Sequence, residues 1–319
     1  MSARDIFIAK AQVRWDRLEA LLGRANWTAP DWSEASLLYR GVCADLARAQ
    51  SLSLGDDVQR YLDQLAGRAH NALYASRART GSGLIALVFR DVPREIRTQW
   101  AFVLAAGLLF YGPMLLGAVG AFLDTNFALA VLPESQLQSM ESMYSNSAPT
   151  RGAGEDATMA GFYVWNNVGI AFRCFATGFF AGLGSIFYLV YNGLVLGTVA
   201  GHLTAVGRGL NLLNFTSGHS AWELNGIVLA GAGGLRMGWA LVVTEGRTRA
   251  GSLQKAGPSL YRLVIGASAM LFVAALVEGF WSAGPMPPPV KYAFGVIQCV
   301  IVVVWWLFGG RGGAGQVRP

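Results

Sequence analysis

The chain has 319 residues, of which 53% are hydrophobic and only 14% are charged, against about 25% charged in a typical soluble protein. This apolar content excludes a disordered chain, and the 40 glycines follow no G-X-Y period, which excludes collagen. The formal net charge of +6 fits basic loops beside membrane spans and does not require a nucleic acid partner. Because small residues let membrane helices approach closely, we expect an all-α, polytopic membrane helical bundle.

Charged residues are concentrated at the N-terminal end. Residues 1–98 hold 14 of the 25 Lys and Arg and 11 of the 19 Asp and Glu. We therefore expect a cytoplasmic helical domain over residues 1–80. The first predicted helix is 9–24, with Ala11, Trp15, Leu18 and Leu22 on its buried face. The second is about 31–50, with Asp31 as its N-cap and Glu34 three positions later. The third is about 56–77.

Residues 81–98 connect this domain to the first span. Their sequence mixes an apolar run with arginines, and Pro93 interrupts the pattern. We expect a juxtamembrane amphipathic helix that lies on the membrane surface with its arginines toward anionic headgroups. The alternative is a fourth helix of the N-terminal bundle.

The transmembrane domain is predicted over residues 99–309, followed by a cytoplasmic tail, 310–319. A span needs about 20 apolar residues. The apolar run 168–206 is too long for one span and is predicted to break at Asn192-Gly193. The six expected segments are 100–123, 168–190, 193–206, 221–243, 263–283 and 291–309.

Loop charges set the expected orientation. The loop 124–165 has five acids and one arginine and is expected outside, whereas the loop 244–262 carries four basic residues and is expected in the cytoplasm. Both termini are then cytoplasmic, in a bacterial inner membrane. Segment 193–206 is short and either spans or re-enters the membrane.

Glycines recur at four-residue spacing and line single helix faces, which permits close helix crossing. The alternative is a sliding surface or a narrow path. The glycines expected at helix contacts are Gly178, Gly182, Gly193, Gly197, Gly201, Gly234 and Gly238.

Ionisable residues inside apolar stretches are costly and therefore indicate a site. The expected orientation brings Arg173, Glu223 and Glu278 to the extracytoplasmic half, with Arg173 pairing with one of the glutamates. His219 shares a helix face with Glu223, and Asn166, Asn167 and Asn192 complete the predicted polar cluster. The cluster either pins helices together, binds a substrate or lipid headgroup, or is catalytic.

Motifs of enzymes are absent from the sequence. There is no H-E-x-x-H, G-x-S-x-G or G-x-x-x-x-G-K-[ST], and three histidines leave few zinc ligands. The cysteines Cys43, Cys174 and Cys299 are widely spaced and form no disulfide framework or metal motif. We expect no catalytic residue, metal, cofactor or nucleic acid partner, and the N-terminus lacks the apolar region of a cleaved signal peptide.

The order and spacing of several motifs resemble the stage II sporulation protein M family. They are Phe162-x-x-x-Asn166-Asn167, Ala171-Phe172, Phe175, Gly178, Gly182-x-Gly184, Tyr191-Asn192-Gly193, Gly197, His219-x-x-x-Glu223, the glycine run ending at Arg236 and Gly238, and Val277-Glu278-Gly279-Phe280. Leu38-Tyr39-Arg40 and Ala44-Asp45-Leu46-Ala47 resemble the longer, non-sporulating members. Ser220 departs from the family, which usually has glycine after the histidine.

The resemblance implies a polytopic inner-membrane protein. The sporulation member is a scaffold for cell-wall-degrading partners during engulfment, and other members accompany a MoxR-type AAA+ ATPase and related membrane proteins. We expect a membrane scaffold that contacts lipids, recruits partners and forms a homo-oligomer. The alternatives are a transporter or lipid-handling permease that uses the outer polar cluster, and a hydrolase.

Overall fold

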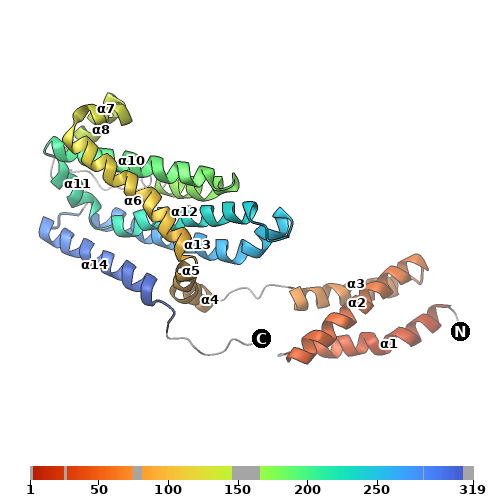
Figure 1. The fold of residues 1–319 in the computed structure, drawn as a ribbon. Helices are drawn as coiled ribbons and strands as arrows, with labels where there is room; N and C mark the ends of the chain where they lie inside the picture. Colours follow the sequence, from red (N-terminus) through yellow and green to blue (C-terminus); the bar gives the residue numbers. More distant parts are fainter. Residues whose placement is uncertain (1–2, 25–26, 75–80, 146–165, 283, 312–319) are drawn as a thin grey trace. The chain divides into compact units, whose positions relative to one another are not determined.

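The computed structural model describes residues 3–24, 27–74, 81–145, 166–282 and 284–311, and the regular elements in this part of the chain are helices. The chain divides into two compact units, Met1–Arg79 and Thr80–Pro319, each with its own hydrophobic core (Figure 1). The all-α class predicted from composition is confirmed.

The N-terminal unit consists of α1 (Ala3–Leu22), α2 (Ala29–Ser51) and α3 (Asp56–Tyr74). Its fully buried side chains include Leu18, Leu21 and Leu62. Leu21 is buried instead of the predicted Leu22, which is only partly buried. The two positions lie three and four residues after Leu18 and therefore flank it on the buried face.

Helix α2 starts two residues before the predicted N-cap. Thr28 is the N-cap, its hydroxyl accepts a hydrogen bond from the backbone N–H of Asp31, and the Asp31 carboxylate accepts one from the backbone N–H of Thr28. The prediction of Asp31 as N-cap was therefore wrong by one turn: Asp31 is the reciprocal partner in a capping box. Residues 75–77 of the predicted third helix lie outside the described residues.

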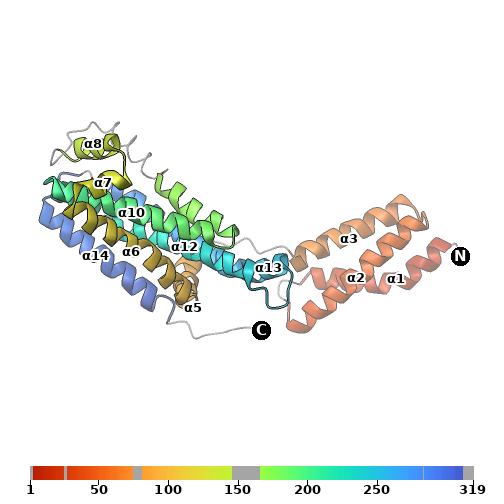
Figure 2. The same ribbon diagram turned by 45° about the horizontal axis from the view of Figure 1, so that its top comes forward.

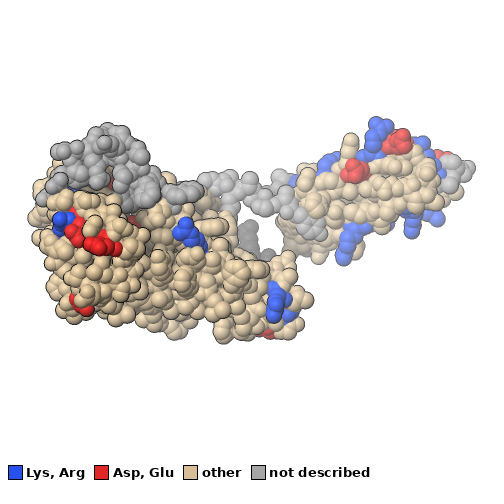
Figure 3. Space-filling view, turned by 90° about the horizontal axis from the view of Figure 1, so that it is seen from above, with Lys and Arg blue, Asp and Glu red and all other residues tan. Residues whose placement is uncertain are grey.

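Among the described residues of the second unit, four helices are long and apolar enough to cross a membrane. They are α6 (Trp100–Leu123), α10 (Leu183–Ala205), the continuous stretch Arg249–Ser282 formed by α13 (Arg249–Val277) and the π-helix η3 (Glu278–Ser282), and α14 (Pro288–Phe308). Most of the visible surface of this unit is uncharged (Figure 3). Short helices α7 (Thr125–Val131), α8 (Glu134–Met143) and α11 (Gly209–Thr216) lie at one end of the bundle (Figure 1).

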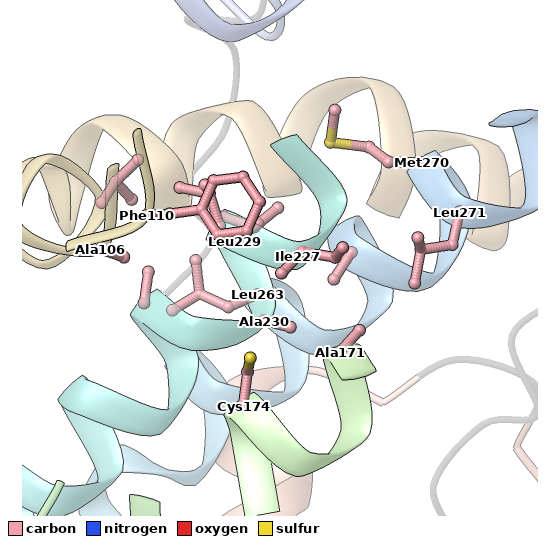
Figure 4. Close-up of a cluster of buried hydrophobic side chains, with 14 of the residues drawn as sticks. Ala106, Phe110, Ala171, Cys174, Ile227, Leu229, Ala230, Leu263, Met270 and Leu271 are labelled. Carbon is pink, nitrogen blue, oxygen red and sulfur yellow. The ribbon is translucent and has the colours of Figure 1, made fainter. Parts of the chain in front are cut away.

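Helix α12 (Ser220–Val242) lies between α13 on one side and α6 and α10 on the other (Figures 1 and 2). It has the longest run of buried residues in the described chain, from Gly226 to Gly234. The core around it contains Phe110, Leu229 and Met270, with Cys174 contributed by the helical segment 166–176 (Figure 4). Tight packing around α12 fixes which of its residues meet each neighbour.

The predicted break of the apolar run 168–206 was wrong by ten residues. Residues 166–176 are helical, η2 (Thr177–Phe179) is one 3₁₀ turn, and the chain reverses at Ala181 and Gly182, whose φ angles are 53° and 85°. Helix α10 then continues through Asn192 and Gly193 without interruption. The short segment is therefore the one before the break, and the predicted segment 193–206 belongs to a full-length helix.

The seven predicted glycines lie at helix contacts inside one chain. A Cβ added to Gly193, Gly197 or Gly201 of α10 would lie 2.1, 1.9 or 2.1 Å from a backbone carbonyl oxygen of α6. A Cβ added to Gly178 would lie 2.2 Å from the Gly234 carbonyl oxygen, and one added to Gly238 would lie 2.2 Å from the Gly182 backbone nitrogen. These glycine faces are occupied by neighbouring helices of the same chain, so they supply no argument for contact between protomers.

Residues 81–98 fold as α4 (Gly81–Ala86), the π-helix η1 (Leu87–Asp91) and α5 (Val92–Thr98). The prediction that their arginines face lipid headgroups was wrong for two of them. Arg97 donates hydrogen bonds to the carbonyls of Trp306 and Gly309, and Arg94 donates one to Gly310. The backbone carbonyls at the end of a helix have no hydrogen-bond donors within the helix, and these guanidinium groups supply donors at the end of α14.

Candidate functional site

A cluster of polar side chains lies at the end of the bundle where α12 begins and α13 ends. His219 is the N-cap residue of α12, and Glu223 lies in its first turn. Glu278 and Ser282 begin and end the π-helix η3. The side chains of His219 and Glu278 are buried, and only 13% of the Glu223 side chain is exposed.

The three ionisable groups are close enough to act together. His219 Nε2 lies 3.6 Å from Glu223 Oε2, and one candidate ligand atom from each of His219, Glu223 and Glu278 lies within 4.8 Å of the others. On the other side of the imidazole, Nδ1 lies 2.8 Å from Ser282 Oγ. The predicted grouping of His219, Glu223 and Glu278 is thus present as a spatial cluster.

Arg173 does not complete the cluster. It is exposed, and it forms no ion pair with Glu223 or Glu278. The reason is helical phase, because Arg173 lies six residues after Asn167 and so points about 120° away from it around the helix. The prediction that this arginine pairs with a buried glutamate was wrong.

The predicted asparagines separate into three environments. Asn167 lines a cavity of about 10 Å³ together with Glu223 and Glu278. Asn166 is exposed and donates its amide to Asn167 Oδ1 at 3.3 Å. Asn192 lies in mid-helix and donates to the Tyr188 carbonyl of its own helix, so it is not part of the cluster.

Three polar residues that were not predicted from the sequence lie in or beside the cluster: Ser282 at the end of η3, and Lys291 and Gln298 on α14. The buried Lys291 donates from Nζ to the Ser282 carbonyl at 2.7 Å, and Gln298 accepts from Trp222 Nε1 at 2.7 Å. Ser282 contacts His219 as described. The signal for Lys291 was its position at the start of an apolar span, where a charge is costly.

A second histidine–carboxylate pair lies at the same end of the bundle. His202 Nε2 of α10 lies 2.8 Å from Glu141 Oε1 of α8, and Arg208 Nη1 lies 3.5 Å from Glu141 Oε2. This carboxylate therefore has a guanidinium nearby. Neither Glu223 nor Glu278 has such an arginine or lysine partner among the described residues.

An apolar groove reaches the cluster from the side. Its volume is about 700 Å³, and it runs between α6, α10, α11 and α12. Its walls are mainly apolar and include Leu196, Leu212 and Leu213. His219 and Glu223 lie at its α12 wall. The arrangement offers an apolar volume with a carboxylate and an imidazole at one edge.

Comparison with known proteins finds two family matches. The family described as Stage II sporulation protein M matches residues 100–283, which is more than half of the chain and includes His219, Glu223 and Glu278. A domain of unknown function, DUF8413, matches residues 5–75 of the N-terminal unit. No curated protein and no solved structure matches the chain.

Proposed function

Because the chain belongs to the stage II sporulation protein M family, we propose that this membrane protein is a non-enzymatic scaffold that recruits a partner through its N-terminal unit. The observation that carries the proposal is the separate, charge-rich N-terminal unit with its own closed core. A domain that folds on its own core is available for contact with another protein. The partner class that the family suggests is a MoxR-type AAA+ ATPase or another membrane protein.

Affinity capture from membranes tests recruitment. A variant lacking residues 1–79 is expected to lose the co-purifying partner while it stays in the membrane after carbonate extraction. Adding an excess of purified N-terminal unit to the full-length chain serves as the matched control, because it competes for the partner without changing the bundle. Unchanged capture in the deletion variant would contradict the proposal.

We also propose that the chain lies in the bacterial cytoplasmic membrane with both termini inside. Basic residues gather at one end of the bundle, at Arg94 and Arg97 of α5, Arg262 of α13, which contacts Glu95 of α5, and Arg311 after α14. Helix α8 at the other end carries two glutamates. Positive residues favour the cytoplasmic side. A phosphatase fused after residue 134 is expected to be active, and one fused after residue 246 inactive; the reverse pattern would exclude this orientation.

The groove favours a second candidate function, the handling of a lipid. An apolar groove of about 700 Å³ lies in the range of ligand pockets, and its edge carries polar groups suited to a headgroup. His219 and Glu223 line the groove and also belong to the polar cluster, so a lipid bound in the groove would contact the cluster directly.

A pair of matched substitutions tests the groove. Leu213 lines it, Leu307 of α14 does not, and both side chains are 47% exposed. Leu213→Trp is expected to reduce the lipid retained by the purified protein in native mass spectrometry, while Leu307→Trp leaves it unchanged. Equal retention by the two variants would exclude a lipid in this groove. The same spectra give the number of chains per particle and so test the predicted homo-oligomer.

A further inference from the structure

We propose that His219, Glu223 and Glu278 bind one divalent transition-metal ion. The proposal goes beyond recruitment or lipid handling, and it does not depend on either. Zn²⁺ and Mn²⁺ are the ions that an imidazole combined with two carboxylates suits, since imidazole binds borderline metals and carboxylate binds harder ones.

The distances among the three groups fit a metal site. In tetrahedral geometry with bonds of about 2.0–2.1 Å, ligand atoms lie about 3.4 Å apart. His219 Nε2 and Glu223 Oε2 are already 3.6 Å apart, and one ligand atom from each of the three residues lies within 4.8 Å of the other two. We expect rotation of the carboxylate torsions to close the remaining distance when the ion binds.

Glu278 supplies an independent reason for a ligand. Glu278 is only 6% exposed, and its carboxylate has no hydrogen-bond donor or cation partner among the described residues. The buried amine of Lys291 donates to the Ser282 carbonyl instead. A buried carboxylate without a partner is costly, and a bound cation removes that cost.

Ser282 holds the imidazole in the orientation that metal binding needs. If Nδ1–H donates to Ser282 Oγ, the Ser282 hydroxyl can donate onward to the Val277 carbonyl, 3.4 Å away. The lone pair of Nε2 then points toward Glu223, where two lone pairs would repel each other unless a cation lies between them. A hydrogen bond that fixes the second ring nitrogen is the usual support of a metal-bound histidine.

A small space lies next to the proposed site. Beside the two carboxylates, a cavity of about 10 Å³ is lined by Asn167, Glu223 and Glu278 but not by His219, and it suits one water molecule. Three protein ligands leave at least one coordination position open. His219 and Glu223 also line the apolar groove, so we expect the open position to be reached from the groove.

The linear sequence conceals such a site. His219 and Glu223 form an i, i+4 pair that lacks the second histidine of a zinc-binding helix, so the sequence analysis expected no metal. The third ligand, Glu278, lies 55 positions after Glu223 and reaches it only through the packing of α12 against α13 and η3.

Metal titration of the purified full-length protein tests the proposal. After treatment with a chelator, the protein is titrated with Zn²⁺ or Mn²⁺ alone in a calorimeter, and we expect one ion per chain. Glu278→Gln and His219→Gln are each expected to weaken affinity at least 100-fold. Ser282→Ala is expected to weaken it about 10- to 100-fold, because it removes only the support of the ligand.

Glu141→Gln is the matched control, because Glu141 also contacts a histidine at the same end of the bundle but has Arg208 beside it. We expect this variant to bind as tightly as the wild type. Absence of binding to the wild type, or equal affinity of all variants, would overturn the proposal. If the variants do not fold, X-ray absorption of the zinc-loaded wild type decides: one imidazole with oxygen ligands supports the site, and a sulfur ligand or oxygen alone refutes it.

Discussion

The contact between α6 and α10 allows a quantitative test of what the glycines do. Gly197 lies against the backbone of Met114, and a Cβ at Gly197 would be 1.9 Å from the Met114 carbonyl oxygen. Real Cβ atoms essentially never approach another atom within 3.0 Å, so Gly197→Ala must separate the two backbones by about 1 Å. Neither atom is at the end of a flexible side chain, so the strain cannot relax locally.

The expected cost follows from this separation. Overpacking costs typically about 1–3 kcal/mol, and here the shift also loosens the adjacent contacts of Gly193 and Gly201. We therefore expect Gly197→Ala to destabilise the bundle by about 3 kcal/mol. At roughly 2–4 °C per kcal/mol for a unit of this size, Tm should fall by roughly 6–12 °C.

Gly112→Ala is the control. Gly112 lies on α6, and a Cβ there would meet nothing within 4 Å. Its Tm is expected to stay unchanged or to rise slightly, because alanine favours a helix over glycine by about 0.5–1 kcal/mol. The assay is the fraction of purified protein that remains monodisperse in size-exclusion chromatography after heating. Equal Tm shifts for Gly197→Ala and Gly112→Ala would refute the packing argument.

Further predictions concern the N-terminal unit. Asp45→Ala should destabilise it by about 1–3 kcal/mol in urea unfolding, because it leaves the buried indole N–H of Trp15 without its 2.9 Å acceptor. Glu34→Ala removes an exposed ion pair and should cost at most about 1 kcal/mol. An equal cost of the two substitutions would contradict this ranking. Hydrogen bonds from Thr28 lower the pKa of Asp31 below its usual value, so this carboxylate stabilises the fold above the unfolded pKa and that contribution is lost as the pH falls through the folded pKa. An acid titration of helicity should therefore show less acid sensitivity in Asp31→Asn than in the wild type, and identical profiles would exclude the effect.

The sequence predicts the class and the approximate helices because apolar runs and helical periodicity act locally. It misplaces the break in the run 168–206 because Asn192-Gly193 looks like a turn in isolation. In the fold, the Asn192 amide binds the carbonyl of Tyr188 in its own helix, and Gly193 fits under the Phe110 carbonyl of α6. A tertiary contact thus decides the role of that glycine, and the local pattern does not show it.

The polar cluster can be predicted only in part from the sequence, for a similar reason. The depth of a residue in the membrane follows from the predicted order and direction of the spans. The sequence therefore predicts that Glu223 and Glu278 lie at the same depth. It does not fix rotation about each helix axis, and Arg173 is therefore misassigned. Ser282 and Lys291 join through a contact between η3 and the start of α14, and neither has a local pattern that predicts it.

The contacts between glycines show how segment 166–176 and α12 are rotated about their own axes. Gly178 meets Gly234 and Gly182 meets Gly238, and each pair is separated by 56 positions, as expected for two segments that run in parallel. Eleven residues are close to three full helical turns, so a step of eleven residues back from Gly178 and Gly234 returns to the same two faces. That step reaches Asn167 and Glu223, which line the same cavity.

The same phase explains the other residues of segment 166–176. Cys174 lies seven residues after Asn167, close to two turns, and it is fully buried on the face toward α12. Arg173 lies seven residues after Asn166, and both are exposed. The glycine register that holds α12 against this segment therefore also determines that Asn167 faces the glutamates and Arg173 does not. It follows that an alanine at Gly178 or Gly234 should disturb metal binding at the cluster from three turns away, whereas one at Gly112 should not.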